Sequence, residues 1–239
     1  MRMFHRAGEE APGPDGIRIE AVSHGYDTRA VLHEVDLNLT ERRIGVVGAN
    51  GSGKSTLARM INGLVLPTSG RVRVDGLDTR THGAAVRRRV GFVFTDPDAQ
   101  IVMPTVGEDV AFSLRKSGLD RADRDARVLA ALARFGLEGH VDHPAHLLSG
   151  GQKQLLALTS VLVTSPRVLV CDEPTTLLDA RNARRVGELI AGLEQQVVLV
   201  THHLEQVEGF DRVLVVEAGR VVADGPPATA LAFYRELVR

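Results

Sequence analysis

The chain has 239 residues, of which 44% are hydrophobic and 4% aromatic, and its 29 Lys and Arg nearly balance its 30 Asp and Glu. No nucleic-acid partner is expected, because such binding requires a basic surface or aromatic side chains that stack on bases. The single cysteine, Cys171, excludes a disulfide framework within the chain and indicates a reducing, cytosolic compartment.

Residues 1–16 are rich in Gly, Pro and Glu, and we expect them to form a flexible N-terminal tail. They lack the apolar segment of a signal peptide. No apolar run along the chain approaches the ~18 residues that a membrane-spanning helix needs. Direct membrane insertion is therefore not expected, and any function at a membrane requires a separate spanning partner.

Alternating apolar residues predict strands after the tail. Three residues of the first strand should share one face: Ile17, Ile19 and Ala21. Further strands are predicted at four places: 35–39, 44–47, 71–74 and 89–94. Short apolar strands separated by helices are typical of a parallel sheet that is covered on both faces.

The segment GANGSGKST at 48–56 follows an apolar strand and precedes a helix predicted over 55–62. It matches the phosphate-binding pattern G-x-x-x-x-G-K-[ST] in full. In this pattern backbone N–H groups surround the phosphates, Lys54 reaches the β and γ oxygens, and Ser55 offers a hydroxyl to Mg²⁺. A merely flexible Gly/Ser loop would not explain the Lys-Ser pair. The other expected binding residues of this turn are Asn50, Gly51, Ser52, Gly53 and Thr56.

The middle of the chain, from about residue 105 to 163, has helical patterning. In the helix expected over 120–135, one face should carry four apolar residues: Val128, Leu129, Leu132 and Phe135. We interpret this region as an α-helical lobe, at about 96–163, inserted into a domain that spans 17–239.

Two further strand ends carry polar residues. The apolar strand at 168–171 leads to Asp172, which would hold Mg²⁺ through water, and Glu173, which would polarise an attacking water. A helix cap is the alternative for two acids in this position, but the phosphate-binding pattern favours catalysis. The strand at 197–200 leads to His202, which would contact a γ-phosphate. A closing hairpin is predicted over 212–223.

The segment LLSGGQKQ at 147–154 places Ser149 and the N–H groups of Gly150 and Gly151 at the start of a helix. A simple N-cap is one interpretation, and an anion-binding turn is the other. Because the helical lobe projects away from the strands, this turn would reach the phosphates of a second copy, turned head to tail.

Residues 17–225 resemble the ATP-binding subunits of ABC transporters. The resemblance is carried by four features in the order typical of that family: the phosphate-binding turn, LSGGQ, DEP and the strand-end histidine. This resemblance implies an α/β fold: a P-loop NTPase core with an antiparallel β portion and an inserted helical subdomain. It gives Lys54, Ser55 and Asp172 the Walker roles and makes Glu173 the catalytic base. The remaining roles that it implies are a switch histidine, His202; a residue linking the two sites of a dimer, Asp179; an adenine-stacking aromatic, Tyr26; and the signature glutamine, Gln152.

The segment at 90–114 resembles the Q-loop and following helix of energy-coupling-factor ATPases. There a glutamine normally helps to bind Mg²⁺ and water, and Thr95 takes its place in this chain. Gln100 matches the family, and three acids nearby are expected to meet arginines of a membrane partner: Asp96, Asp98 and Glu108. A second departure is Leu155, where the family has arginine.

The resemblance is strongest to ATPases of biotin importers. It implies an ATP-hydrolysing subunit that dimerises with a second copy or a related chain around two MgATP, at the cytoplasmic face of the membrane. Its partners would be a transmembrane coupling protein and a membrane substrate-binding protein. Four alternatives stay open: an ATPase of a cobalt, nickel or other energy-coupling-factor or ABC importer, a soluble ABC ATPase without a transport role, a regulatory module that binds ATP without hydrolysis, and an exporter cassette.

Overall fold

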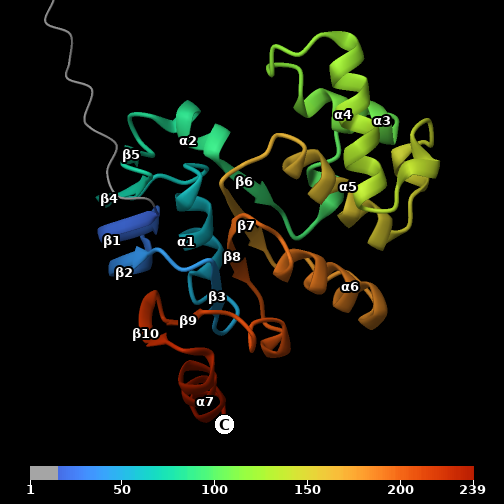
Figure 1. Ribbon diagram of the computed structural model, residues 1–239. Coiled ribbons are helices and arrows are strands. Elements are labelled where there is room, and N and C mark those ends of the chain that lie inside the picture. Colours follow the sequence, from blue (N-terminus) through green and yellow to red (C-terminus); the bar gives the residue numbers. More distant parts are fainter. Residues whose placement is uncertain (1–15) are drawn as a thin grey trace, which may run out of the picture.

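The computed structural model describes residues 16–239, so the expected tail lies outside the described residues except for Gly16. An antiparallel sheet of four strands, in the order β2-β1-β4-β5, forms one layer of the molecule (Figure 1). Its strands are β1 (Ile17–Tyr26), β2 (Arg29–Leu39), β4 (Ser69–Val74) and β5 (Leu77–Asp78). The expected antiparallel portion is therefore present at the N-terminal end of the described chain.

The alternation predicted for β1 is interrupted by a bulge. Ile17 and Ile19 are buried and pair with Leu39 and Leu37, as the pattern predicts. The register then shifts, so that Val22 is the next buried residue, and Ala21 is exposed with a φ of 46°. The expectation that Ala21 shares the buried face was wrong, because one extra residue in a bulge reverses which side chains face inward.

A second sheet has six strands in the order β10-β9-β3-β8-β7-β6. Its strands are β3 (Arg43–Val47), β6 (Val90–Val93), β7 (Val168–Asp172), β8 (Gln196–Val200), β9 (Arg212–Glu217) and β10 (Arg220–Gly225). All neighbouring strands are parallel except β9 and β10, which form the predicted hairpin. Ala218 and Gly219 join them with φ values of 44° and 76°, the backbone that a two-residue hairpin turn requires.

Helices cover both faces of the six-stranded sheet. On one face, α1 (Lys54–Ile61) packs between this sheet and the antiparallel one, in a core that includes Met60 and Ile61. On the other face, residues of α6 (Ala180–Ala191) and α7 (Pro227–Leu237) pack against the core. The short helix α2 (Gly83–Arg89) precedes β6. The sequence patterns did not predict α7.

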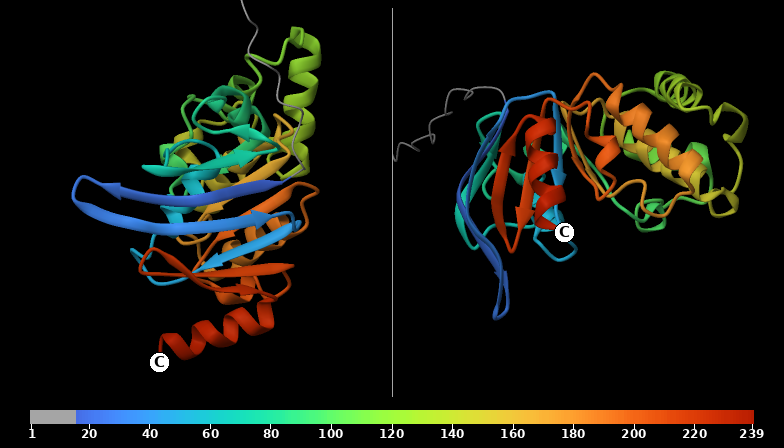
Figure 2. Two further views of the ribbon diagram at one scale, coloured as in Figure 1. Left: turned by 90° about the vertical axis from the view of Figure 1, so that its left-hand side faces the viewer. Right: turned by 90° about the horizontal axis from the view of Figure 1, so that it is seen from below.

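Three helices between β6 and β7 gather to one side of the sheets, as the view from below shows (Figure 2). They are α3 (Val106–Ser113), α4 (Arg121–Arg134) and α5 (Gly150–Leu162). Val128, Leu132 and Phe135 of the expected helical face are buried, whereas Leu129 is 52% exposed. Leu129 was wrongly placed because it lies 100° around the helix from Val128, toward solvent.

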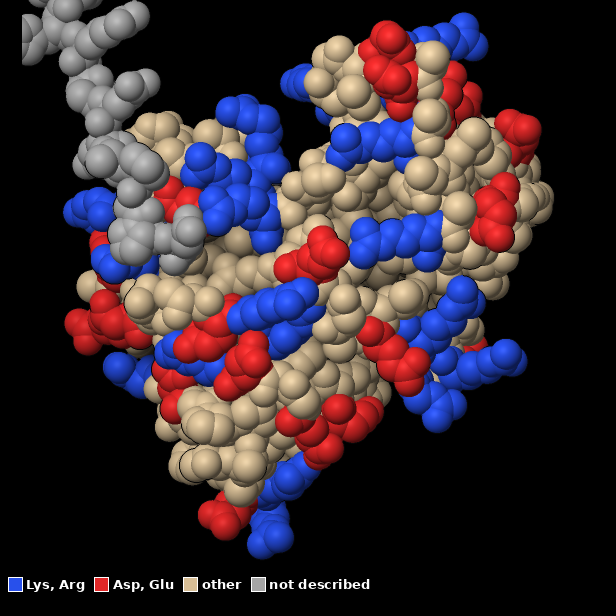
Figure 3. Space-filling model, viewed as in Figure 1, with Lys and Arg blue, Asp and Glu red and all other residues tan. Residues whose placement is uncertain are grey.

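Four short 3-10 turns complete the described chain: η1 (Pro97–Ala99), η2 (Glu138–His140), η3 (Ala145–Leu147) and η4 (Leu204–Gln206). Across residues 16–239, the structure contains no helix with the length and apolar character needed to cross a bilayer. Positive and negative side chains are mixed over the face that Figure 3 shows, with a basic group over α2, whose last turn is Arg87, Arg88 and Arg89.

Candidate nucleotide-binding site

A pocket of about 440 Å³ lies at the glycine-rich turn between β3 and α1. Its lining residues come from the β1–β2 hairpin, the turn, α1 and the end of β7: Tyr26, Arg29, Val31, Asn50, Gly51, Gly53, Lys54, Ser55, Thr56 and Glu173. The structure thus brings together residues that are far apart in the sequence. Arg29 and Val31 were not predicted, because they belong to no motif.

The turn has a backbone that only glycine adopts without strain. Gly51 and Gly53 have φ values of 79° and 105°. A side chain on Gly53 would also place its Cβ 2.8 Å from Leu32 Cδ2 and 2.9 Å from the Val31 carbonyl oxygen. Ser52 Oγ is buried without a hydrogen-bond partner among the described residues. A narrow loop with an unpartnered buried hydroxyl is suited to a phosphate group, which offers several acceptor oxygens.

Lys54 lies at the start of α1 and is only 5% exposed. Its Nζ donates hydrogen bonds to the carbonyl oxygens of Gly48 and Ala49, both at 2.8 Å. Burial lowers the pKa of Lys54 below its usual value, while Glu173 and Asp172 act in the opposite direction. The ammonium group is therefore held at the phosphate loop with incomplete charge compensation, so a phosphate there would be favoured electrostatically.

Ser55 and Asp172 meet beneath this pocket. Ser55 Oγ donates to Asp172 Oδ1 at 2.7 Å, and Arg59 Nη2 donates to Asp172 Oδ2 at 3.2 Å. Asp172 is 1% exposed. A hydroxyl and a carboxylate in contact form the oxygen donor set that Mg²⁺ prefers, so these two residues fit the metal. Arg59 was missed by the sequence patterns, although its position one turn after Ser55 on α1 is the available signal.

Thr95, expected as a metal ligand in place of a glutamine, lies just beyond β6. Its Oγ1 donates a hydrogen bond to the backbone carbonyl oxygen of Asp172 at 2.7 Å. The structure therefore ties Thr95 to the backbone of the strand that carries the carboxylate. The hydroxyl oxygen retains lone pairs that could accept a hydrogen bond from a water molecule.

Glu173 and His202 lie in direct contact. His202 Nδ1 donates to Glu173 Oε2 at 2.5 Å, and Thr176 Oγ1 donates to the same oxygen at 2.7 Å. Glu173 has a φ of 53°, a left-handed backbone that is unusual for a residue with a side chain. Such strain concentrates at functional sites. The sequence patterns did not predict a role for Thr176, although it follows Glu173 by only three residues in the chain.

Gln206 connects the ends of the two strands that carry these residues. Its Nε2 donates to Thr175 Oγ1 at 3.0 Å, and its Oε1 accepts from Thr201 Oγ1 at 3.4 Å. Thr175 follows β7, and Thr201 follows β8. Gln206 was also missed, because a contact between two loops leaves no periodic pattern in the sequence.

Tyr26, the expected adenine-stacking residue, ends β1 and is 47% exposed. Its ring lies edge-on to that of His24, with 4.7 Å between the ring centroids. One side of the pocket thus carries an exposed aromatic side chain, which is suited to stacking on a planar base.

The LSGGQ segment starts α5 with a capping box. Ser149 Oγ accepts from Gln152 N at 3.4 Å, and Gln152 Oε1 accepts from Ser149 N at 2.9 Å. The simple N-cap interpretation is therefore satisfied by the structure. Residues 149–152, which we call the signature turn, do not line the pocket at the glycine-rich turn.

Asp179, the expected link between the two sites of a dimer, caps α6. Its carboxylate accepts from the backbone N and the Nδ2 of Asn182, at 2.9 Å and 2.7 Å, and these hydrogen bonds lower the pKa of Asp179. Asn182 also lies against the signature turn, since a Cβ on Gly151 would lie 2.7 Å from its Cγ. The start of α6 and the start of α5 are therefore neighbours.

The Q-loop, here residues 94–100, contacts α5, the helix that begins in the signature turn. Lys153 Nζ lies 2.8 Å from Asp98 Oδ1, and Gln100 accepts from Phe94 N at 3.2 Å while it donates to the Ala157 carbonyl oxygen at 3.3 Å. Asp98, expected to meet a partner's arginine, is therefore already paired within the chain. Asp96 caps η1, and Glu108 accepts from Thr105. Leu155, the departure from arginine, is buried in the core.

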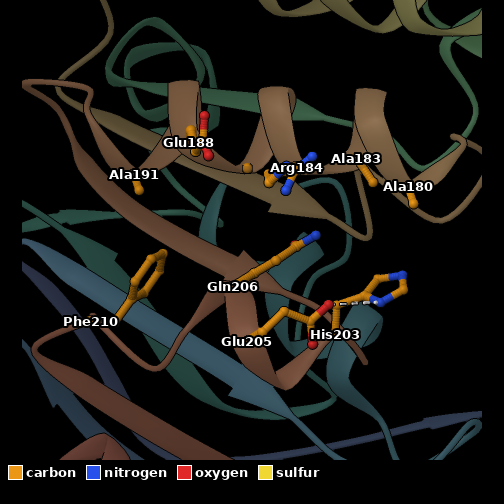
Figure 4. Close-up of a pocket in the computed structure, with 11 residues that line it drawn as sticks. Ala180, Ala183, Arg184, Glu188, Ala191, His203, Glu205, Gln206 and Phe210 are labelled. Carbon is orange, nitrogen blue, oxygen red and sulfur yellow. Dashed lines mark ion pairs between the residues drawn. The ribbon is translucent and has the colours of Figure 1, made fainter.

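A larger groove of about 640 Å³ lies elsewhere, between α6 and residues 203–210. Figure 4 shows Ala180, Ala183 and Ala191 of α6 facing this segment. His203 lines the groove and forms an ion pair with Glu205 at 3.4 Å, which Figure 4 also shows. The groove shares no lining residue with the pocket at the glycine-rich turn. Although the groove is larger, it is therefore a separate feature and not part of the candidate nucleotide site.

A model of the ABC transporter family matches residues 32–176. A putative ABC transporter ATP-binding protein of Deinococcus radiodurans is 56% identical over 92% of this chain and 97% of its own length. A biotin transport ATP-binding protein of Rhizobium etli is 48% identical over 92% of this chain and 98% of its own length. The chain belongs to the ABC transporter family, as an ATP-binding subunit.

Solved structures agree with this assignment. The cbiO1 protein of Clostridium perfringens, part of the ABC transporter complex cbiONQ, matches with a TM-score of 0.82 and 33% identity, over 95% of this chain and 94% of that chain. The ATP-binding cassette MJ0796, in a dimeric post-hydrolysis state with ADP and phosphate, matches with a TM-score of 0.78 and 27% identity, over 88% and 98% of the two chains. The expected fold and the expected ABC ATPase class are confirmed.

Proposed function

We propose that this chain is the ATP-hydrolysing subunit of an energy-coupling-factor importer, with biotin as the favoured cargo. The observation that carries the proposal is the pocket in which Lys54, Ser55 and Glu173 converge, with His202 bonded to the glutamate. These groups are the ones that phosphoryl transfer to water requires. The biotin assignment is supported by the Rhizobium relative, which covers nearly the whole of both chains.

In this mechanism the chain itself binds and orients the triphosphate. Lys54 exchanges the carbonyl oxygens of Gly48 and Ala49 for phosphate oxygens, while the N–H groups of the turn donate to the same anion. Tyr26 stacks on the base. Glu173 accepts the proton of the attacking water, and His202 holds the glutamate through Oε2.

Magnesium fits the pair of Ser55 and Asp172, whose oxygens lie 2.7 Å apart. Bound there, the metal would supply charge neutralisation to the phosphates. Among residues 16–239 no cluster of three or more His, Cys, Asp and Glu is arranged to hold a metal. This agrees with a magnesium site in which the nucleotide and water provide most of the ligands.

The complete site requires a second ATPase subunit. The signature turn, which binds phosphate in this proposal, lies outside the pocket of its own chain. A two-fold dimer would bring the turn of each copy to the phosphates of the other and create two equal sites. Support comes from the dimeric state of the related ATP-binding cassette MJ0796.

The proposed assembly lies at the cytoplasmic face of the membrane. A transmembrane coupling protein docks on the chain, and a membrane substrate-binding protein holds the cargo. A tagged chain, purified from its native membranes, should bring both proteins with it for identification by mass spectrometry. In vesicles, the complex should take up labelled biotin when ATP is supplied, whereas a complex with Lys54→Ala should not.

Cobalt or nickel import is the second candidate, because the similar cbiO1 protein is part of the cbiONQ complex. The same vesicles separate the two, since labelled cobalt or nickel would enter in place of biotin. Nucleotide turnover without a membrane partner or any transported cargo would contradict the transport proposal and favour a soluble ABC ATPase.

A further inference from the structure

His140 lies against the glutamine of the signature turn. This histidine ends η2, and its Nε2 lies 3.0 Å from Gln152 Nε2. Its ring is also edge-on to His143, with 5.5 Å between the ring centroids. The backbone of this loop is held by α3, because Val106 N donates to the His143 carbonyl oxygen at 3.1 Å. His140 is therefore fixed at the base of the turn by surrounding structure.

The orientation of the Gln152 amide follows from the capping box. Its Oε1 accepts from Ser149 N at 2.9 Å, so its Nε2, which carries hydrogen, must face His140. An amide NH₂ only donates, and the imidazole Nε2 must therefore accept. This requires a neutral ring with its proton on Nδ1, which is buried without a hydrogen-bond partner among the described residues.

We propose that His140, in its neutral Nδ1–H form, is a positioning residue that holds the signature turn through Gln152. A proton on Nε2 would place two donors against each other. The Gln152 side chain would then have to turn, and Ser149 N would lose its acceptor. This proposal rests on the proposed function, in which the Ser149 hydroxyl and the turn bind the phosphates of a second copy.

Other charged or titratable groups surround this contact and must be considered in a pH experiment. Lys153 forms an ion pair with Asp98, and His202 contacts Glu173 at the other end of the composite site. The remaining groups lie on the same loop or on helices next to it: Glu138, Asp142, His143, Arg134 and Arg185. The test therefore compares variants that differ only at His140.

The first experiment measures the protonation of His140 directly. Long-range ¹H–¹⁵N spectra of the full chain distinguish the two neutral tautomers, and His140→Gln identifies the resonances. We expect the Nδ1–H tautomer at pH 8, with a change in the Gln152 side-chain amide as the ring takes up a proton. An Nε2–H tautomer, or a Gln152 amide indifferent to that protonation, would overturn the proposal. This measurement does not depend on dimerisation.

The second experiment measures MgATP-dependent dimerisation between pH 8 and 5 in the Glu173→Gln background. With His140 present, the dimer should weaken about tenfold toward pH 5, the effect of one lost hydrogen bond in each turn. In the His140→Gln protein this tenfold weakening toward pH 5 should disappear, because the amide oxygen of the new glutamine accepts a hydrogen bond at every pH. With His140→Leu, dimerisation should be weak at every pH. The matched control is His146→Gln, since His146 is exposed on the same loop.

Identical pH profiles for the His140 and His140→Gln proteins would refute the positioning role while leaving the dimer intact. If no variant dimerises at any pH, the proposed function fails in that respect, and the tautomer measurement still decides whether His140 positions Gln152.

Discussion

At the scale of single residues, Asp172 joins three parts of the chain. Its carboxylate accepts from Ser55 and Arg59, and its carbonyl oxygen accepts from Thr95. A buried carboxylate is stable only when such partners are present. The pocket is therefore organised by hydrogen bonds before any ligand arrives, which reduces the cost of ordering it on binding.

Lys54→Ala removes the buried ammonium group at the phosphate loop. We expect ATPase activity of the complex to fall by at least about 100-fold, because a preorganised charge in such a site contributes on this scale. Steady-state phosphate release measures it. Lys116→Ala, on an exposed part of the chain, is the matched control and should leave the rate unchanged. Undiminished turnover by Lys54→Ala would remove the assignment of the site.

Thr95→Gln introduces the glutamine that the resemblance to energy-coupling-factor ATPases implies at this position. Activity should be preserved or raised, because the longer side chain can offer an oxygen to the metal and water. Thr95→Val, which keeps the shape but loses the bond to Asp172, should lower stability by about 1 kcal/mol. A collapse of turnover in Thr95→Gln, measured in the intact complex, would show that the threonine hydroxyl has a specific role.

The sequence predicted those residues of the candidate site that occur in contiguous motifs, including Lys54 and Glu173. It did not predict Arg59 or Gln206. The partner of Arg59 lies on β7 and the partners of Gln206 lie in two loops, and they become neighbours only after folding. His140 was missed for the same reason. Ala21 was misplaced because a bulge depends on pairing with a second strand, which the alternation within one strand does not reveal.

At the scale of elements, α5 connects the signature turn to the Q-loop. Its first residues form the signature turn, and Lys153 and Ala157 further along it bind the Q-loop through Asp98 and Gln100. A displacement of the Q-loop would therefore act on the same helix that carries the turn. The helices of this region were predicted by period and by Gly136 after α4, whereas α7 had no comparably clear signal.

Asp120→Ala tests a helix end that is remote from the chemistry. The carboxylate of Asp120 accepts from Asp123 N at 2.9 Å at the start of α4. Its loss should cost about 1 kcal/mol, or about 2–4 °C in melting temperature, with ATPase activity unchanged. Calorimetry measures the shift, and Asp120→Asn should retain most of the cap. An equal loss of turnover and stability would show that α4 acts on the site.

At the scale of the whole molecule, the proposed mechanism assigns phosphate binding to two surfaces on different parts of one chain, the phosphate loop and the signature turn. The loop follows the carboxyl end of β3, an inner strand of the six-stranded sheet, and the turn starts α5 in the helical region (Figure 1). Hydrolysis in this account requires the two surfaces to meet across a dimer. Glu173→Gln keeps the size of the side chain but removes the base, so bound ATP should persist and hold the dimer closed.

Light scattering of the Glu173→Gln protein tests this claim most directly. Without nucleotide the protein should have the 25.8 kDa mass of one chain, and with MgATP it should have twice that mass. Adding Lys54→Ala should abolish the change. A protein that binds MgATP with its phosphates at Lys54 and yet keeps the mass of one chain would contradict the account.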